Sequence, residues 1–84
     1  MDKKTAVIIF KITQRNFSID LEVPLDISAN DLVLALDKAY SLDIDTDNIK
    51  NNYLQAERPI ALLKGTKTLE EFGVRNGTII YFTE

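Results

Sequence analysis

The sequence predicts an α+β fold in which a mixed β-sheet packs on a single long helix. Three observations support this prediction. Two strand-like segments, 5–13 and 17–23, are separated by a short turn, which is typical of a hairpin. An amphipathic segment at about 29–41 has the spacing of a helix. A further strand-like run, 78–83, comes late in the chain, and parallel pairing with the first strand would place it at the centre of the sheet.

The hairpin is predicted from residue type and alternation. Segment 5–13, TAVIIFKIT, is rich in β-branched and aromatic residues, which favour strands. Segment 17–23, FSIDLEV, alternates apolar and polar residues with period two, as a half-buried strand does. Pro24 follows, and it should end this strand because proline lacks a backbone N–H donor.

The helix is predicted from its cap and its apolar spacing. Ser28 is a favourable N-cap, and Asp31 three residues later completes a capping box. Leu34 is expected on the solvent side. The residues expected on the buried side are Ala29, Leu32, Val33, Leu36, Ala39 and Tyr40.

The second half of the chain contains shorter elements. A third strand is expected at 51–57 and a fourth at 60–63. Thr68 and Glu71 form a capping box for one helical turn, and Gly73 should end it. Asn76–Gly77 then turns the chain into the last strand. The expected order is ββαββ-turn-β, in a single domain that spans residues 1–84.

Composition limits the possible functions. The chain has 84 residues, a net charge of −3, no cysteine and no histidine. Disulfides, thiolate nucleophiles and catalytic imidazoles are therefore absent, so we expect neither an enzyme nor a cofactor. The negative balance disfavours nucleic acid as a partner. The first residues lack a signal-peptide pattern and no apolar run reaches the length of a membrane span, so we expect a cytoplasmic protein without direct membrane insertion.

An acidic loop raises the question of metal binding. Asp43, Asp45 and Asp47 have the spacing of the first three ligands of an EF-hand loop. The sixth position holds Asn48 instead of glycine, and the twelfth holds Leu54 instead of glutamate. We therefore expect a solvated acidic loop and no metal site, although the sequence leaves weak calcium binding at Asp43–Asp47 open.

Two stretches carry a resemblance to known proteins. IDLEVPLDISANDLVLAL (19–36) and KTLEEFGVRNGTIIYF (67–82) resemble ubiquitin over nearly the whole chain. This resemblance implies a ubiquitin-like β-grasp fold. TLEEFGVRNGTIIYF (68–82) and the small size are more similar to the YukD/EsaB family, small bacterial ubiquitin-like proteins encoded beside type VII secretion systems of Gram-positive bacteria. That similarity implies a cytoplasmic accessory or regulatory protein that binds a component of the secretion machinery.

Conjugation to targets and sulfur transfer are not expected. Both reactions activate a glycine carboxylate at the end of a flexible tail. The sequence has no Gly-Gly pair, and its last glycine is Gly77. We therefore expect a protein that works by being bound.

The outer face of the predicted sheet is the candidate binding site. Lys11 should face water, so alternation places Val7 and Ile9 on the same side, and Ile8, Phe10 and Ile12 in the core. On the last strand, Ile80 and Phe82 should face the helix. The outward residues that we expect to form a protein-binding patch are Val7, Ile9, Tyr53, Ile79 and Tyr81.

Ubiquitin uses the same sheet face for recognition, but the resemblance is incomplete here. The third strand presents Tyr53, Gln55 and Glu57 on that side, so the apolar area has moved toward the first and last strands. Standard ubiquitin receptors are therefore doubtful partners. An alternative that the sequence leaves open is an unrelated β-grasp adaptor, or a homodimerising scaffold module that buries the same patch. A small apolar patch without function is also compatible with the sequence.

Overall fold

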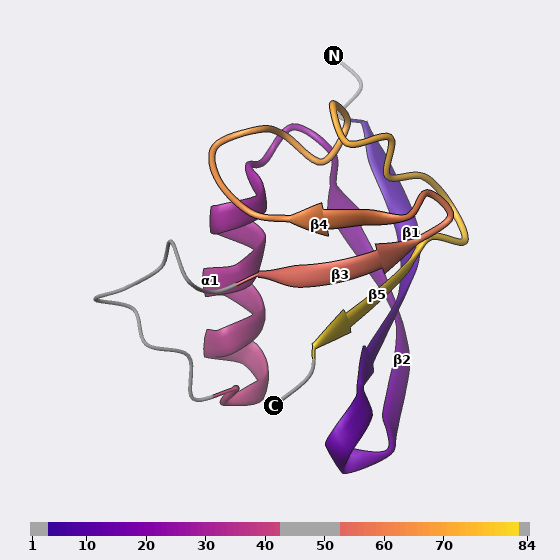
Figure 1. The fold of residues 1–84 in the computed structure, drawn as a ribbon, viewed down its shortest axis with the longest axis vertical. Helices are drawn as coiled ribbons and strands as arrows, with labels where there is room; N and C mark the ends of the chain where they lie inside the picture. Colours follow the sequence, from indigo (N-terminus) through magenta and orange to yellow (C-terminus); the bar gives the residue numbers. More distant parts are fainter. Residues whose placement is uncertain (1–3, 43–52, 83–84) are drawn as a thin grey trace.

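A long hairpin forms one side of the molecule (Figure 1). The computed structural model describes residues 4–42 and 53–82. Strands β1 (Thr5–Ile12) and β2 (Phe17–Pro24) pair in antiparallel orientation from Thr5↔Pro24 to Ile12↔Phe17. A 3-10 turn, η1 (Thr13–Arg15), joins them, and Asn16 closes it in the left-handed conformation with φ of 53°. The expected first hairpin is confirmed.

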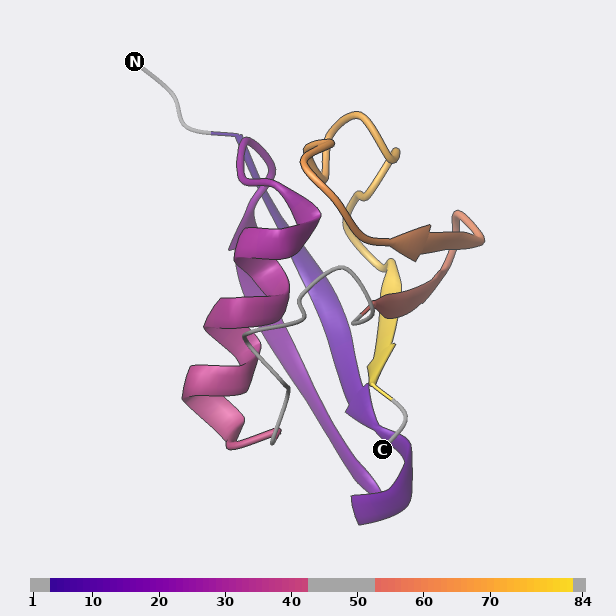
Figure 2. The same cartoon turned by 60° about the vertical axis from the view of Figure 1, so that its left-hand side comes forward.

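Helix α1 (Ala29–Tyr40) follows the hairpin and covers one face of the sheet (Figure 2). The Ser28 hydroxyl accepts the Asp31 N–H at 3.1 Å, which is the expected N-cap bond. At the other end, the left-handed Ser41 donates its N–H to the Asp37 carbonyl at 2.8 Å. These caps satisfy backbone groups that helix ends otherwise leave without partners.

The helix differs from expectation at one position. Ala29, Leu32, Val33 and Leu36 are buried, and Leu34 is exposed, as expected. Ala39 was expected to be buried but is exposed. It lies on the flank of the helix that faces β2, where a groove remains open between the two elements.

The last strand lies inside the sheet, as the sequence predicts. The strand order is β2-β1-β5-β3-β4, and β5 (Ile79–Phe82) runs parallel to β1. Strand β3 (Leu54–Glu57) pairs with the other side of β5, and β4 (Ala61–Leu63) pairs with β3, both in antiparallel orientation. Both shorter strands begin later than expected, β3 at Leu54 and β4 at Ala61.

A single turn before β5 closes one end of the core. The Thr68 N–H donates to the Glu71 carboxylate at 3.1 Å and the Glu71 N–H donates to the Thr68 hydroxyl at 3.2 Å, a complete capping box. The Phe72 N–H donates to the Thr68 carbonyl at 3.1 Å, which is helical spacing, and Gly73 ends the turn with φ of 85°. Leu69 and Val74 on this turn are buried.

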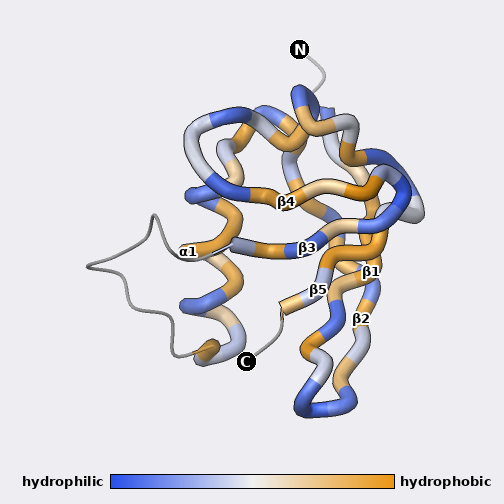
Figure 3. Tube along the Cα trace, in the orientation of Figure 1, coloured by the Kyte–Doolittle hydropathy of each residue, from blue (hydrophilic) through white to orange (hydrophobic). Residues whose placement is uncertain are grey.

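The core lies between α1 and the inner face of the sheet. Hydrophobic residues run along most of β1 and into β5, whereas the hairpin tip is hydrophilic (Figure 3). The strand residues on the inner face that are fully or almost fully buried are Ala6, Ile8, Phe10, Ile12, Val23, Leu54, Ala56, Leu63 and Ile80. Phe82 packs against this core while remaining partly exposed. The alternation expected for the first and last strands is confirmed.

The one helix among the described residues is too short to cross a membrane.

Candidate functional site

Cross-strand pairing defines which residues lie side by side on the outer face of the sheet. Ile9 is the Cα partner of Ile79, and the latter is the partner of Glu57 on its other side. One step along, Lys11 pairs with Tyr81, and Tyr81 pairs with Gln55. Because side chains in paired positions point to the same face, two rows of outward side chains cross the sheet.

Val7, Ile9 and Ile79 form a continuous apolar group on this face. Val7 is 45% exposed, and Ile9 and Ile79 are half-buried. The Val7 N–H donates to the Asn76 side-chain oxygen at 2.8 Å, and its carbonyl accepts the Gly77 N–H at 2.9 Å. These bonds hold the turn before β5 against β1, so that Val7 lies beside the start of β5.

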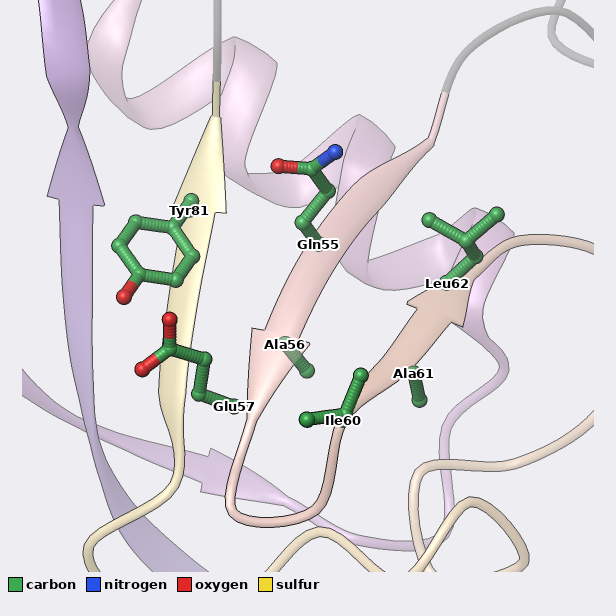
Figure 4. Close-up of a pocket in the computed structure, with 7 residues that line it drawn as sticks. All are labelled: Gln55, Ala56, Glu57, Ile60, Ala61, Leu62 and Tyr81. Carbon is green, nitrogen blue, oxygen red and sulfur yellow. The ribbon is translucent and has the colours of Figure 1, made fainter.

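Tyr81 continues the apolar area toward β3. The Glu57 side chain is the main cause of a pKa of the Tyr81 phenol that is raised above the ordinary tyrosine value of 10.0. Figure 4 shows the two side chains turned toward each other on the sheet face opposite α1.

Two apolar residues at this site were missed by the sequence analysis. Ile60 is 91% exposed, and Leu62, whose Cα partner is Gln55, is 50% exposed. With Tyr81 they border a shallow depression of about 370 Å³ (Figure 4). Alternation could have located Leu62, since a strand that buries Leu63 must turn Leu62 outward.

Tyr53 lies at the far end of the face. It precedes β3 and is 47% exposed. Gln55 is the partner of Tyr81, and Tyr53 lies two residues further along, past that end of the patch. Val7 lies two residues from Ile9 toward the opposite end of the sheet face. The structure therefore brings Val7, Ile9, Ile79 and Tyr81 together and places Tyr53 at the margin of the patch.

The described residues contain no group of three acidic side chains arranged to hold a metal ion. The acidic loop Asp43–Asp47 lies outside the described residues. The Lys4 ammonium contacts the Glu70 carboxylate at 2.6 Å, and this bond raises the pKa of Lys4. Both side chains are largely exposed, so this pair is a surface ion pair of small energetic value.

Solved structures share this fold. The ubiquitin-like domain of tubulin-binding cofactor B matches with a TM-score of 0.77 and 20% identity, over 99% of this chain and 92% of that chain. The C-terminal ubiquitin-like domain of mouse tubulin-specific chaperone e matches with a TM-score of 0.76 and 12% identity, over 99% and 89%. The corresponding domain of Plasmodium falciparum Dsk2 has a TM-score of 0.59 and 20% identity, over 93% and 97%. The ubiquitin-like β-grasp fold is thereby confirmed.

Sequence comparison identifies the family. No curated protein sequence matches the chain. The family model described as "WXG100 protein secretion system (Wss), protein YukD" matches residues 7–82. This range includes the described strands in full, apart from the first two residues of β1. The resemblance noted in the sequence is confirmed: this ubiquitin-like chain belongs to the YukD family of the WXG100, or type VII, protein secretion system.

Proposed function

We propose that the chain is a non-catalytic accessory or regulatory protein of the type VII secretion system that acts by binding a protein component of the machinery. The family supplies the link to secretion. The lack of cysteine and histidine supports a role in binding, because the commonest nucleophilic and acid–base side chains are missing. We propose that it acts in the cytoplasm and is not conjugated to its target.

The observation that carries the proposal is the apolar outer face. The face comprises Val7, Ile9, Ile60, Leu62, Ile79 and Tyr81, and these residues are hereafter called the outer patch. Three of the β-strands and the turn between β3 and β4 contribute to it. Tyr81 adds a rigid aromatic side chain, a type enriched in the centres of protein interfaces.

Conservative substitutions can test whether the outer patch is the binding site. Ile9→Thr combined with Ile79→Thr keeps β-branched side chains, which suit the central strands, and removes apolar surface. Leu34→Gln is the matched control, because Leu34 is an exposed apolar residue on α1. Host cells that lack the chain would be complemented with each variant, and export of WXG100 substrates and capture of secretion components by the tagged chain would be measured.

We expect the double variant to lose both capture and export while the control retains both. Circular dichroism and thermal unfolding must show that the double variant is folded. Normal capture and export by a folded double variant would refute the outer patch as the site. Species of higher mass that contain the tagged chain would refute action without conjugation.

A second copy of the chain is a further candidate partner for the outer patch. Lys11 and Glu57 flank the apolar residues with charges of opposite sign, which would allow a two-fold arrangement. Light scattering over a range of concentrations would detect a dimer that the double variant abolishes. A monomer at all concentrations would refute this homodimerising role.

A further inference from the structure

A second apolar surface lies on the other side of the sheet, between β2 and α1. It is a groove of about 460 Å³. Its floor is formed by Leu21 and Val23 of β2, and by Leu32 and Leu36 of α1. The helix side of the groove carries two small residues, Ala35 and Ala39, which leave room above the floor. This volume is in the range of ligand-binding pockets, roughly 300–1,000 Å³.

The groove runs beside a strand edge that has no neighbouring strand among residues 4–42 and 53–82. In this part of the chain, β2 is first in the strand order and pairs with β1 alone. The Val7 carbonyl accepts the Gly77 N–H, and the Ile9 N–H donates to the Thr78 carbonyl, so the odd-numbered residues of β1 face β5. The even-numbered residues of β1 therefore face β2.

This orientation identifies the free backbone groups. Ile8 is opposite Leu21, and Phe10 is opposite Ile19, so odd-numbered residues of β2 exchange hydrogen bonds with β1. The even-numbered residues Ser18, Asp20 and Glu22 then direct their N–H and C=O groups toward the free edge. Such an edge can accept another strand.

The side chains of β2 divide in the same way. Ile19, Leu21 and Val23 lie on the helix side, where Ile19 is 40% exposed despite its apolar character. Asp20 and Glu22 lie on the opposite face, and both are exposed. A strand added at this edge would place alternate side chains in the groove and the others beside these two carboxylates.

The charges around the groove indicate what kind of strand could bind there. The charged residues that border it in the described part of the chain, Glu22 and Asp31, are both acidic. The Glu22 carboxylate lies on the outer face, where it accepts the Thr5 hydroxyl at 3.1 Å. Near the C-terminal end of α1, the Arg15 guanidinium donates to the Tyr40 and Ser41 carbonyls at 2.9 and 3.0 Å. Lys38, in the last turn of α1, is outside the groove lining.

Self-pairing of β2 at this edge is unfavourable in the two antiparallel registers that overlap the strand most. Antiparallel self-pairing centred on Asp20 would put this carboxylate opposite its own copy. Pairing centred on Leu21 would put Asp20 opposite Glu22. Like charges in directly opposite positions destabilise a strand pair.

We propose that the β2–α1 groove binds an extended segment of a partner protein, in which apolar residues alternate with lysine or arginine. The segment adds to β2 as a sixth strand of the sheet. Its apolar side chains lie beside Ile19, Leu21 and Val23, and the last two of these residues line the groove. Its basic side chains pair with Asp20 and Glu22. The groove lies on the opposite face of the sheet from the outer patch, whereas Asp20 and Glu22 border that patch as the Cα partners of Ile9 and Val7. The proposal does not depend on the function proposed for the outer patch.

Three blocked peptides test the proposal: VKVKV, VEVEV, and VVVKK, which has the composition of the first without its alternation. Binding would be followed by amide chemical shifts and amide hydrogen exchange of the labelled full chain. We expect VKVKV to protect the amides of Ser18, Asp20 and Glu22, and to bind about tenfold more tightly than either control, since two charge pairs contribute.

Variants of the protein make the test specific. In Asp20→Lys with Glu22→Lys, the preference should reverse to VEVEV. In Asp20→Asn with Glu22→Gln, it should disappear. Ala39→Trp should abolish binding of VKVKV by filling the groove, because Ala39 is exposed and this change leaves the core untouched. Ile9→Thr with Ile79→Thr should bind VKVKV normally, so failure of the outer patch and failure of the groove are distinguishable.

Three results would overturn the proposal. Equal binding of VKVKV and VEVEV to the unmodified chain would remove the charge selection. Peptide-induced shifts confined to the outer patch, or no shifts at millimolar peptide, would remove the site. A concentration-dependent dimer that protects the three amides without peptide would assign the edge to self-pairing.

Discussion

The two faces of the central strands contain equally apolar residues but lie in opposite environments. On β1, Ile8 is buried and the next residue, Ile9, is only half-buried. On β5 the same relation holds between Ile80 and Ile79. Consecutive isoleucines therefore serve the core and the surface, and their chemistry alone does not distinguish them.

Strand β2 shows what an ordinary solvent face looks like in the same sheet. Its outward residues are Ser18, Asp20 and Glu22. The inner residues of β1 and β5 must be apolar because they form the core. Their outer residues have no such requirement, and apolar residues gathered there are what the proposed binding role needs.

The largest expected effect comes from comparing two neighbouring isoleucines on β5, one on each face of the sheet. Ile80→Ala should lower the free energy of unfolding by about 2–5 kcal/mol, since it leaves a cavity in the core. Ile79→Ala should cost about 1 kcal/mol or less, the range of strand propensity. Urea unfolding of both variants measures the difference. Similar costs would show that the outer face contributes to folding as much as the core, and would weaken the binding interpretation.

The inner face also contains one buried polar residue, and it sharpens the comparison. The Thr78 hydroxyl donates to the Arg58 carbonyl at 2.7 Å and accepts the Arg75 N–H at 3.0 Å. Thr78→Val keeps the side-chain shape and removes both bonds. We expect a loss of about 1–3 kcal/mol, because backbone groups in this partly buried place lose their partner. Thr78→Ser, which keeps the hydroxyl, should recover part of this loss in the same unfolding measurement, and no recovery would contradict the hydrogen-bond explanation.

Alternation and capping signals predicted much of this fold. They identified Ile8, Phe10 and Ile12 as core residues, because the period of a strand assigns each residue to a face. The parallel pairing of the last strand with β1 was predicted from the order of the elements and is confirmed. The period does not say where a helix lies over a sheet. For this reason Ala39 was expected in the core, and the groove between β2 and α1 was not foreseen.

The candidate site was predicted less completely, also for a physical reason. Neighbours on the outer face are set by cross-strand register, which depends on pairings between distant segments. Leu62 joins Gln55 and Tyr81 only because β4 pairs with β3 in the observed register. Tyr53 was included, but the same register places it at the margin. Strand pairing, more than residue type, therefore decides which apolar residues form the patch.

A smaller effect is expected from the interaction between Glu57 and Tyr81 on the outer face. Glu57→Gln should lower the pKa of Tyr81 toward the ordinary tyrosine value, because the charged acceptor that favours the neutral phenol is removed. NMR titration of ring-labelled tyrosine would measure this change, and Tyr81→Phe would assign the signal. An unchanged pKa would show that Glu57 does not interact with the Tyr81 phenol in solution.

The smallest expected effect concerns the turn that closes the inner face. Hydrogen bonds from Thr68 to the carboxylate lower the pKa of Glu71 from its ordinary value of 4.5. The unfolded chain therefore binds this proton at higher pH than the folded chain. The stabilisation from the capping box is present above pH 4.5 and is lost as the pH falls through the lower pKa of the folded state. Glu71→Gln should accordingly lower the melting temperature near neutral pH, and the difference from the unmodified chain should shrink in acid.

Thr68→Ala provides the control for that last prediction, since it removes the partner of Glu71 in the capping box. In this background, Glu71→Gln should change the pH dependence of the melting temperature much less. An undiminished change would mean that Glu71 acts through other charges and not through the cap. Leu69 follows Thr68 directly and is buried in the core. The outcome therefore also shows whether the exposed hydrogen bonds between Thr68 and Glu71 help to stabilise the core beside them.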